Sequence, residues 1–456
     1  MQAHLFQTSS ALATRRIVRG DGARLWDDHG RRYLDASAGA MVVNLGHGDA
    51  VVLDALARQS SAVAYVSRTS FISDALEAYA EKVARIVPVD DARVFTVSGG
   101  SEGIETAFKM ARAYHVANGE PGRHKILSRQ GEYHGATRGA LDATDRPTYD
   151  RIYRPWLGQT VKLPRVYEYR CPFSDTHPIG CLDRHVDAFE ATIETEGPET
   201  IACFVFETVT GATTGVNMAD EPYWRRIQEI ARAHGILLIA DEVMSGFGRT
   251  GRWFASQHWD VRPDILVAGK GASSGYWPLA FVAVEGEVAE LIAASGVFTH
   301  GFTHSQSTTG AAVGGAVIDR LTELDVEELV PRRGDAFLGA LRREVGEHPL
   351  VGDVRGIGLF AAVELVRDRD TRRPFDRRDR VAEHVVEAGL DAGLYVYSSV
   401  VLADGTDGDM LLFGPPFVTP TDELEEMASL TRAALDRVLG SHGGCRRADP
   451  AASSSR

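Results

Sequence analysis

The chain has 456 residues, 44% hydrophobic and 25% charged, so it is long enough for more than one domain and has a globular composition. Its 63 acidic residues outnumber 49 basic ones, and the formal net charge of −14 argues against nucleic acid as a partner. No apolar run reaches the roughly 18 residues of a membrane span, and the first twenty residues lack a signal peptide's apolar core. We therefore expect a cytoplasmic protein with neither a nucleic-acid nor a membrane partner.

Short apolar runs alternate with amphipathic stretches through the middle of the chain. Helical periods separate several of them, for example over Pro222–His234. This alternation predicts an α/β domain with a mostly parallel sheet. The runs with the length of strands are Val94–Val97, Lys125–Leu127, Ile201–Phe206, Ile236–Ala240, Ile265–Ala268 and Phe281–Val284.

After about residue 325 the pattern changes to charged amphipathic helices with a few strands, such as Leu359–Glu364. We therefore expect a large domain over residues 60–325 and a smaller α+β domain built from both chain ends, residues 1–59 and 326–440. Residues 441–456 are rich in Gly, Ser, Ala and Arg and are predicted to form a disordered tail.

The first motif with chemical content is the glycine-rich turn Ser98–Gly103, which lies between a predicted strand and a helix over Ile104–Val116. Glycines let backbone amides approach a ligand closely, and a helix N-terminus carries partial positive charge. The turn therefore suits one phosphate monoester. Many turns of this kind are glycine-rich merely to be tight, so the motif alone leaves both interpretations open.

The next motif is Tyr133-His134-Gly135, which follows the strand that starts at Lys125. An aromatic side chain at that place can stack on a flat ring. The alternative is an ordinary half-buried loop aromatic.

Asp241-Glu242 stands at the carboxyl end of the Ile236–Ala240 strand, where α/β proteins bind ligands. A buried carboxylate there can keep a pyridinium nitrogen protonated and so make the ring an electron sink. An N-cap or a loop salt bridge is the alternative interpretation.

Lys270 follows the Ile265–Ala268 strand within Gly269-Lys270-Gly271. A lysine flanked by glycines at a strand end has no helix face to decorate, and desolvation there lowers its pKa and favours Schiff-base chemistry. A surface lysine in a loop is the alternative, and the neighbouring motifs weigh against it.

Two runs resemble nucleotide-binding motifs but do not fit the structural context that those motifs need. The run Gly246–Gly251 matches GxGxxG, but residues 241–245 intervene after the strand and no convincing helix follows. Asp264 stands where a Walker loop that ends at Lys270 needs its first glycine.

The cysteines define a further question. Cys171, Cys181, Cys203 and Cys445 are too few for a disulfide scaffold. Cys171 and Cys181 bracket a loop that contains His177, but the spacing fits no strong zinc pattern and no fourth ligand is evident. We expect a plain surface loop and no metal.

Taken together, these residues resemble the class III (omega) aminotransferases, which belong to the aspartate-aminotransferase-like fold type I of pyridoxal-phosphate-dependent enzymes. The resemblance covers roughly residues 20–435, and its most specific part is the run Asp241–Gly251 followed by Lys270. The stretch Tyr169–Phe173 looks most like the branch that uses pyruvate with taurine or omega-amino acids.

The resemblance implies a role for each motif. Lys270 would hold pyridoxal 5'-phosphate as an aldimine and move the proton, and Asp241 would bind the pyridine nitrogen. The resemblance also implies a homodimer with shared sites, in which Thr303 reaches across from the partner subunit, and it places Glu207 near the substrate. The other expected cofactor contacts are Gly100, Ser101, Tyr133, His134, Val243, Glu207 and Thr303.

The chain departs from the family where substrates bind. Met41 replaces a pocket tryptophan, Tyr397 occupies the approximate position of a mobile carboxylate-binding arginine, and Leu412 falls where ornithine-type members carry an arginine. Thr208, Thr210 and the segment Ser305–Thr309 also differ from the usual pattern. Both arginines that usually bind a substrate carboxylate are therefore absent, and Arg138 is our candidate substitute.

We therefore expect an aminotransferase that moves an amino group from a primary amine or omega-amino compound to a keto acid or aldehyde, with a pyruvate-like acceptor. Decarboxylation or aminomutase chemistry on the same fold uses the same groups around the cofactor, because the outcome depends on which bond lies perpendicular to the ring. A non-catalytic module that binds the cofactor is the alternative from another class, and an intact Lys270 speaks against it.

Overall fold

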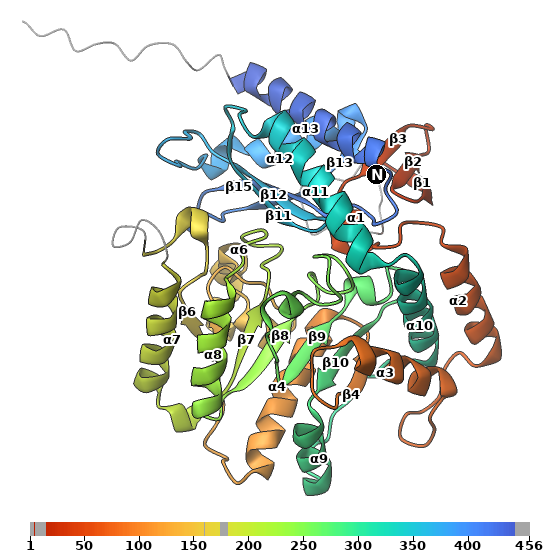
Figure 1. Cartoon of the computed structure of the whole chain (residues 1–456), viewed down its shortest axis with the longest axis vertical. Helices are drawn as coiled ribbons and strands as arrows, with labels where there is room; N and C mark the ends of the chain where they lie inside the picture. Colours follow the sequence, from red (N-terminus) through yellow and green to blue (C-terminus); the bar gives the residue numbers. More distant parts are fainter. Residues whose placement is uncertain (1–3, 5–14, 159, 174–180, 443–456) are drawn as a thin grey trace, which may run out of the picture.

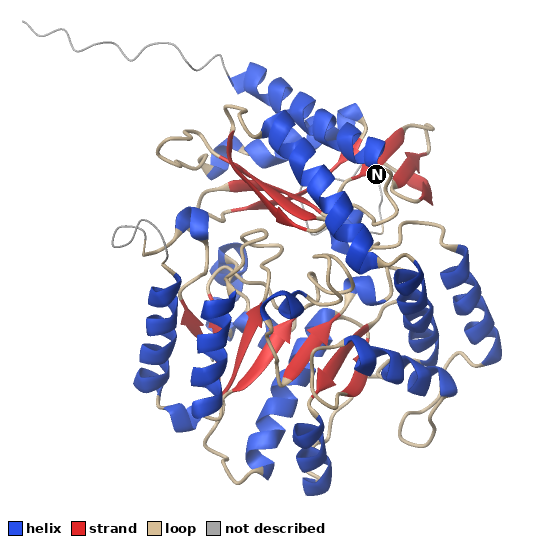
Figure 2. Cartoon of the chain, in the orientation of Figure 1, coloured by secondary structure: helices blue, strands red, loops and turns tan. Residues whose placement is uncertain are grey.

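The computed structural model describes residues 4, 15–158, 160–173 and 181–442. Figure 1 shows a large layered unit in the lower part of the view and a smaller unit above it. Figure 2 shows the central sheet of the large unit with helices on both of its faces. In the part of the chain that is described, no helix is long and apolar enough to cross a membrane.

The large unit is built on a seven-stranded sheet. Its neighbouring strands pair in parallel, except that β10 runs antiparallel to both β4 and β9. In spatial order the strands are β4 (Arg93–Val97), β10 (Ala280–Val284), β9 (Ile265–Ala268), β8 (Leu237–Asp241), β7 (Ile201–Glu207), β5 (Lys125–Arg129) and β6 (Thr160–Leu163). The predicted α/β class with a mostly parallel sheet is confirmed.

Strand β7 shows why this sheet is covered on both faces. All seven of its residues are buried. Cys203 and Val205 pack into the cluster formed with α4 and α9, whereas Phe204 and Phe206 pack into the cluster formed with α7 and α8. Successive side chains of a strand point to opposite faces, so a continuous apolar run needs a helical layer on each side. The helices of this unit are α4 (Gly100–Ala117), α5 (Arg138–Ala143), α6 (Pro147–Tyr153), α7 (Leu182–Glu196), α8 (Glu221–Ala233) and α9 (Gly286–Ser295).

The upper unit contains two four-stranded sheets. One joins the two ends of the chain, because β13 pairs in parallel with β3. Its strands are β1 (Ile17–Asp21), β2 (Arg24–Asp27), β3 (Arg32–Asp35) and β13 (Leu394–Tyr395). The other sheet is antiparallel and consists of β11 (Val351–Ile357), β12 (Phe360–Leu365), β15 (Asp409–Phe413) and β14 (Tyr397–Val400).

The remaining helices cover the upper sheets and connect the units. Helix α10 packs against α2 and α3, and α13 packs against both α11 and α12. Their apolar faces share one extended core with strands from both units. They are α1 (Ala38–Met41), α2 (Ala50–Ala62), α3 (Asp74–Ile86), α10 (Thr308–Glu323), α11 (Val326–Val345), α12 (Val381–Ala392) and α13 (Thr421–His442).

The expected element bounds agree closely with the structure, with one informative difference. The strand Ile265–Ala268 is as predicted, but α4 begins at Gly100 instead of Ile104. Helix propensity argues against glycine in a first turn. Gly100 is required for a different reason, because a Cβ there would lie 2.9 Å from Val243 Cγ1. The glycine motif is thus the N-terminus of the helix itself.

Candidate active site

A cavity of about 410 Å³ lies at the carboxyl ends of β7, β8 and β9. Parallel strands end along the same edge of a sheet, so their last residues converge there. The structure brings together eight of the residues expected from the sequence, all of which line this cavity: Gly100, Ser101, Tyr133, His134, Glu207, Asp241, Val243 and Lys270.

Lys270 is held in a constrained backbone conformation. It begins a short 3-10 helix over Lys270–Ala272, and its φ of 44° lies in the left-handed region. Non-glycine residues adopt this conformation rarely, and where they do the surrounding structure must impose it. A Cβ on the following Gly271 would lie 2.5 Å from Asn44 Nδ2 and 2.9 Å from Phe247 Cβ. Only glycine therefore lets the chain turn closely enough to aim Lys270 into the cavity.

The Lys270 amine is easier to deprotonate than an ordinary lysine. Burial lowers its pKa to about 8, although the nearby carboxyl groups of Glu207 and Asp241 act in the opposite direction. Arg249 adds to the lowering. A substantial neutral fraction exists near pH 8, and only the neutral amine is a nucleophile or a base.

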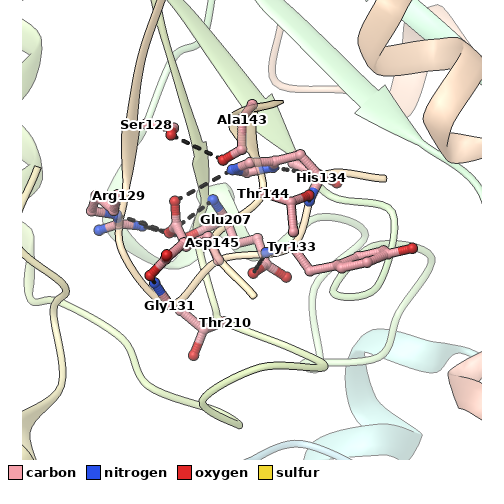
Figure 3. Close-up of polar contacts among 12 residues, drawn as sticks. Ser128, Arg129, Gly131, Tyr133, His134, Ala143, Thr144, Asp145, Glu207 and Thr210 are labelled. Atoms are coloured by element: carbon pink, nitrogen blue, oxygen red, sulfur yellow. Dashed lines mark hydrogen bonds and ion pairs between the residues drawn. The ribbon is translucent and has the colours of Figure 1, made fainter. Parts of the chain in front are cut away.

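A buried chain of charged groups runs behind the cavity (Figure 3). Asp241 Oδ2 lies 2.8 Å from His134 Nδ1, and His134 Nε2 lies 3.5 Å from Glu132 Oε2. Arg129 donates from Nε to Glu132 Oε1 at 2.8 Å and makes a second contact through Nη2. Each of the four residues is at most 4% exposed, so every charge depends on its neighbour for compensation.

This chain determines the charge of His134. Burial disfavours the imidazolium, but Asp241 and Glu132 outweigh burial and raise the pKa of His134 to about 9. At neutral pH both ring nitrogens therefore carry protons, one directed at each carboxylate. Asp241 is held in place by this contact and by the Val243 amide, which donates to Oδ1 at 3.1 Å. Its carboxylate thus has a fixed orientation at the cavity wall.

Glu207 has the opposite character. Burial, together with the charges of Glu132 and Asp241, raises its pKa to about 8. Its Oε2 accepts a hydrogen bond from the Tyr133 amide at 3.1 Å, and its Oε1 accepts one from the Gly211 amide at 3.0 Å. Figure 3 shows Glu207 among the charged cluster and the Tyr133 ring directed away from it. Glu207 therefore holds a proton more readily than an ordinary glutamate, and both of its oxygens are fixed by backbone amides beside the cavity.

The start of α4 forms one end of the cavity. Ser101 Oγ accepts a hydrogen bond from the Ala136 amide at 3.0 Å. A Cβ on Gly135 would lie 2.5 Å from that oxygen, and the φ of 138° at Gly135 also requires glycine. Ser98, Gly99, Gly100 and Ser101 all line the cavity, and the backbone amides at the start of a helix suit a phosphate monoester.

The positions expected to select the substrate are placed differently. Met41 and Leu412 are at most 1% exposed and belong to an apolar cluster that also contains Tyr167 and Val209. Tyr397 packs against the same cluster. Tyr397 and Leu412 are partners on neighbouring strands, so the two places where the resemblance leads us to expect arginines lie side by side. Val42, rather than Met41, lines the cavity.

Two further expected residues lie outside the cavity lining of their own chain. Arg138 is exposed, donates from Nε to the Trp156 carbonyl at 3.2 Å and lies over the Trp156 ring. Thr303 is also exposed, in the loop before α10.

Sequence reasoning missed several residues of the site. Arg129 and Glu132 carry the charge chain, and a signal for them existed, because a charged residue that ends a buried strand is almost always paired. The other missed residues form the walls of the cavity and include Val42, Ala212, Met244, Ser273, Gly275, Trp277, Pro278 and Leu279. No local pattern marks them, since a wall is defined by which loops meet.

Comparison with known proteins gives one consistent result. The family described as "Aminotransferase class-III" matches residues 6–435. Putrescine–pyruvate aminotransferase from Pseudomonas aeruginosa is 32% identical over 92% of this chain and 90% of its own length. Hypotaurine/taurine–pyruvate aminotransferase from Paracoccus denitrificans is 32% identical over 93% of this chain and 92% of its own. An (S)-enantioselective omega-transaminase from Thermomicrobium roseum is 37% identical, covers 93% of each chain and superposes with a TM-score of 0.85.

Proposed function

The chain belongs to the class III aminotransferases, which use pyridoxal phosphate and transfer an amino group from an amine to a keto acid, and on that premise we propose that Lys270 is its catalytic lysine. The observation that carries the proposal is a buried amine with a pKa lowered to about 8 in the same cavity as the Asp241 carboxylate. A structural lysine at a strand end needs neither the cavity nor the left-handed backbone that aims it there.

The residues present fit the cofactor. The glycine-lined first turn of α4 suits its phosphate, and Gly100 lets that turn pack directly against Val243, where a Cβ would lie 2.9 Å from Cγ1. The Asp241 carboxylate, oriented by His134, suits a protonated ring nitrogen. We propose that Tyr133 and Val243 pack on the ring, and that Gly100, Ser101 and Glu207 make the remaining contacts within the chain. The cofactor, when bound, supplies the electron sink that makes the proton on the substrate's α-carbon acidic.

The chain's own groups then handle the proton and the charge. The neutral Lys270 amine takes a proton at Nζ from the substrate carbon. It then gives that proton to the carbon of the cofactor that accepts it. The Asp241 carboxylate is held by His134, whose Nδ1 lies 2.8 Å from Oδ2, and in that orientation it would stabilise a positive ring nitrogen. Glu207 holds the backbone amide of Tyr133, and its raised pKa reflects burial together with the charges of Glu132 and Asp241.

Borohydride reduction of the cofactor-loaded protein tests the assignment of Lys270. We expect the cofactor to become attached to Lys270, as peptide mapping would show. Attachment to another lysine would refute the assignment.

For the substrates, we propose a primary amine or omega-amino donor that carries no carboxylate near the reacting carbon, and a pyruvate-like acceptor. The support is the apolar character of the cluster around Met41 and Leu412, together with Tyr397 at a place where relatives put an arginine. An arginine–carboxylate pair contributes about 1.5–3 kcal/mol through charged hydrogen bonds, which this arrangement forgoes. The diamine named for the Pseudomonas aeruginosa relative is consistent with such a donor.

The acceptor still carries a carboxylate that needs a cation. Arg138 is our proposal from the sequence, and its contact with Trp156 would have to open for this role. Arg146 is a second candidate. It lines a neighbouring cavity, and it acts on Tyr133: burial raises the pKa of Tyr133, whereas the charge of Arg146 acts in the opposite direction. Arg138→Ala and Arg146→Ala should be compared on pyruvate. Replacing the arginine that binds the carboxylate should raise KM for pyruvate. An unchanged KM in a variant excludes that arginine.

We further propose a homodimer in which Thr303 of the partner subunit reaches the phosphate. Two observations support it: Thr303 is exposed and outside its own cavity lining, and large apolar side chains are exposed on the neighbouring 65–72 segment, with Phe71 and Ile72 each 66% exposed. Mixing inactive Lys270→Ala chains with inactive Thr303→Ala chains should restore activity, provided that the Thr303 variant is inactive alone. A fully active monomer in sedimentation would contradict the dimer.

Two broader expectations from the sequence remain proposals. Domain boundaries near residues 59 and 325 can be tested by limited proteolysis, and a cytoplasmic location can be tested by cell fractionation. Residues 441–442, the first two of the expected disordered tail, belong to helix α13. The rest of that tail, residues 443–456, lies outside the described residues.

A further inference from the structure

A second cluster of reactive side chains lies away from the active-site cavity, at the start of α7. Cys171 follows the short helix Glu168–Arg170, Cys181 directly precedes α7, and His185 lies in its first turn. One ligand atom from each residue lies within 4.8 Å of the others. Within the described ranges this is the one group of three or more His, Cys, Asp or Glu side chains gathered so closely. His177, which the sequence pointed to, lies outside the described residues.

The local fold explains why these three side chains meet. Cys181 and His185 are four residues apart at the start of one helix, so their side chains share a face. Cys171 arrives from a segment fixed to the upper unit. Arg170 Nε donates to Glu364 Oε1 on β12 at 2.5 Å, and Arg372 donates to the Tyr169 carbonyl at 2.8 Å. The cluster therefore joins α7 of the large unit to a segment anchored on the small one.

His185 has the form of a metal ligand. It is 4% exposed, and its Nε2 lies 4.0 Å from Cys171 Sγ. An imidazole nitrogen beside two cysteine sulfurs is a donor set that zinc accepts.

We propose that Cys171, Cys181 and His185 form a zinc site when the two cysteines are reduced, with water as the fourth ligand. Zinc binds sulfur at about 2.3 Å and imidazole nitrogen at about 2.0–2.1 Å, so its tetrahedral ligand atoms lie about 3.5–3.8 Å apart. The 4.0 Å between Cys171 Sγ and His185 Nε2 is close to that spacing, and the other ligand atoms fall within reach of it after small side-chain rotations.

The proposal includes a change of redox state, because Cys171 and Cys181 are joined by a disulfide in the structure. A dithiol reductant breaks the S–S bond by supplying two electrons and two protons, and is itself oxidised to a disulfide. The two resulting thiols release their protons as zinc binds the thiolates. A disulfide oxidant reverses the process and releases the metal, so zinc and the disulfide are alternative clamps at one place.

This site deepens the picture of a neighbouring cavity without depending on the proposed aminotransfer. Pro172, next to Cys171, lines the cavity of about 510 Å³ that also contains Arg146 and Arg165.

Zinc titration of the full-length chain tests the proposal. All proteins carry Cys445→Ser, so the fourth cysteine cannot contribute. Protein reduced with a dithiol and stripped of metal is titrated with zinc against a chromophoric chelator. We expect one zinc per chain, which is lost in Cys171→Ser and Cys181→Ser and weakened at least about tenfold in His185→Gln. Cys203→Ala is the matched control, because Cys203 is a buried free cysteine away from the cluster.

Equal zinc binding by the reduced parent and by a Cys171→Ser/Cys181→Ser double variant would overturn the site. A disulfide that dithiol cannot reduce in the folded protein would overturn it equally. If a variant does not fold, the zinc X-ray absorption spectrum of the reduced parent decides the matter. Two sulfur ligands and a nitrogen support the site, whereas a shell of only nitrogen and oxygen refutes it. None of these outcomes changes the mapping of the cofactor to Lys270.

Discussion

Two regions of the molecule bear on the same reaction and are built in opposite ways. At the carboxyl edge of β7–β9, buried charges form a continuous chain from Arg129 through Glu132 and His134 to Asp241. Around β14 and β15, the positions expected to choose the substrate are apolar and packed, as Met41 and Leu412 show. A buried charge cannot change without leaving its partner unpaired, whereas apolar side chains can be exchanged at small cost. The first region therefore holds the chemistry, and the second can vary with the substrate.

The comparison predicts that the largest effect comes from the charged region. Lys270→Ala should lower amine-transfer turnover at least about 10³-fold, because it removes both the attachment point and the proton carrier. Stopped-flow measurement of the half-reaction with a primary amine checks this. Lys162→Ala is a matched control, since Lys162 is a half-buried lysine whose pKa burial likewise lowers to about 8, but it does not line the cavity. Equal losses in both variants would contradict the role of Lys270.

The next effect is on stability. Glu132→Gln leaves Arg129 and His134 with a missing negative charge in a buried site, and removing one partner of a buried pair costs about 3–5 kcal/mol. Urea unfolding of the cofactor-free protein measures the change. Met41→Leu is the control from the apolar region and should cost under about 1.5 kcal/mol. A Glu132→Gln protein as stable as the Met41→Leu protein would show that the chain of buried charges does not contribute this free energy to stability.

The pH dependence of stability sharpens the same point. Folding raises the pKa of His134 from 6.5 to about 9, so its contribution is complete below pH 6.5 and is lost as the pH rises through 9. About 3 kcal/mol of the wild-type stability should depend on this titration and be absent from the pH profile of His134→Gln. His115→Gln is the control, because burial lowers the pKa of His115 and its contribution is instead lost as the pH falls. Unfolding free energies at pH 6.5 and 9 give the comparison.

The smallest effect is expected in the apolar region. Tyr397→Arg should restore a cation where relatives carry one and raise kcat/KM for omega-amino acids about tenfold over uncarboxylated amines, which corresponds to about 1.4 kcal/mol. Tyr397→Met, which changes the side chain without adding charge, should not. If wild type already prefers short omega-amino acids strongly, the argument from the missing arginines is wrong.

The fold could be predicted largely from the sequence, because its signals are local. The apolar run Ile201–Phe206 forms strand β7, and the charged amphipathic stretch Pro222–His234 corresponds to helix α8. The start of α4 was placed four residues late, because a glycine that close packing requires looks like a helix breaker when read alone.

The sequence predicts that Asp241 and Lys270 meet, because Asp241 ends β8, Lys270 follows β9 by two residues, and strand ends of a parallel sheet converge. Arg129 and Glu132 were missed, since the charge chain joins residues from a strand, a loop and a second strand end that have no common sequence pattern. The same holds for His185, which meets Cys171 and Cys181 only because α7 begins beside a segment anchored to β12. The sequence by itself determined the elements and the reactive residues at their ends, because these follow from local periodicity. Only the tertiary structure decided which buried charges pair and which side chains form the walls, because such contacts depend on distances between segments far apart in the chain.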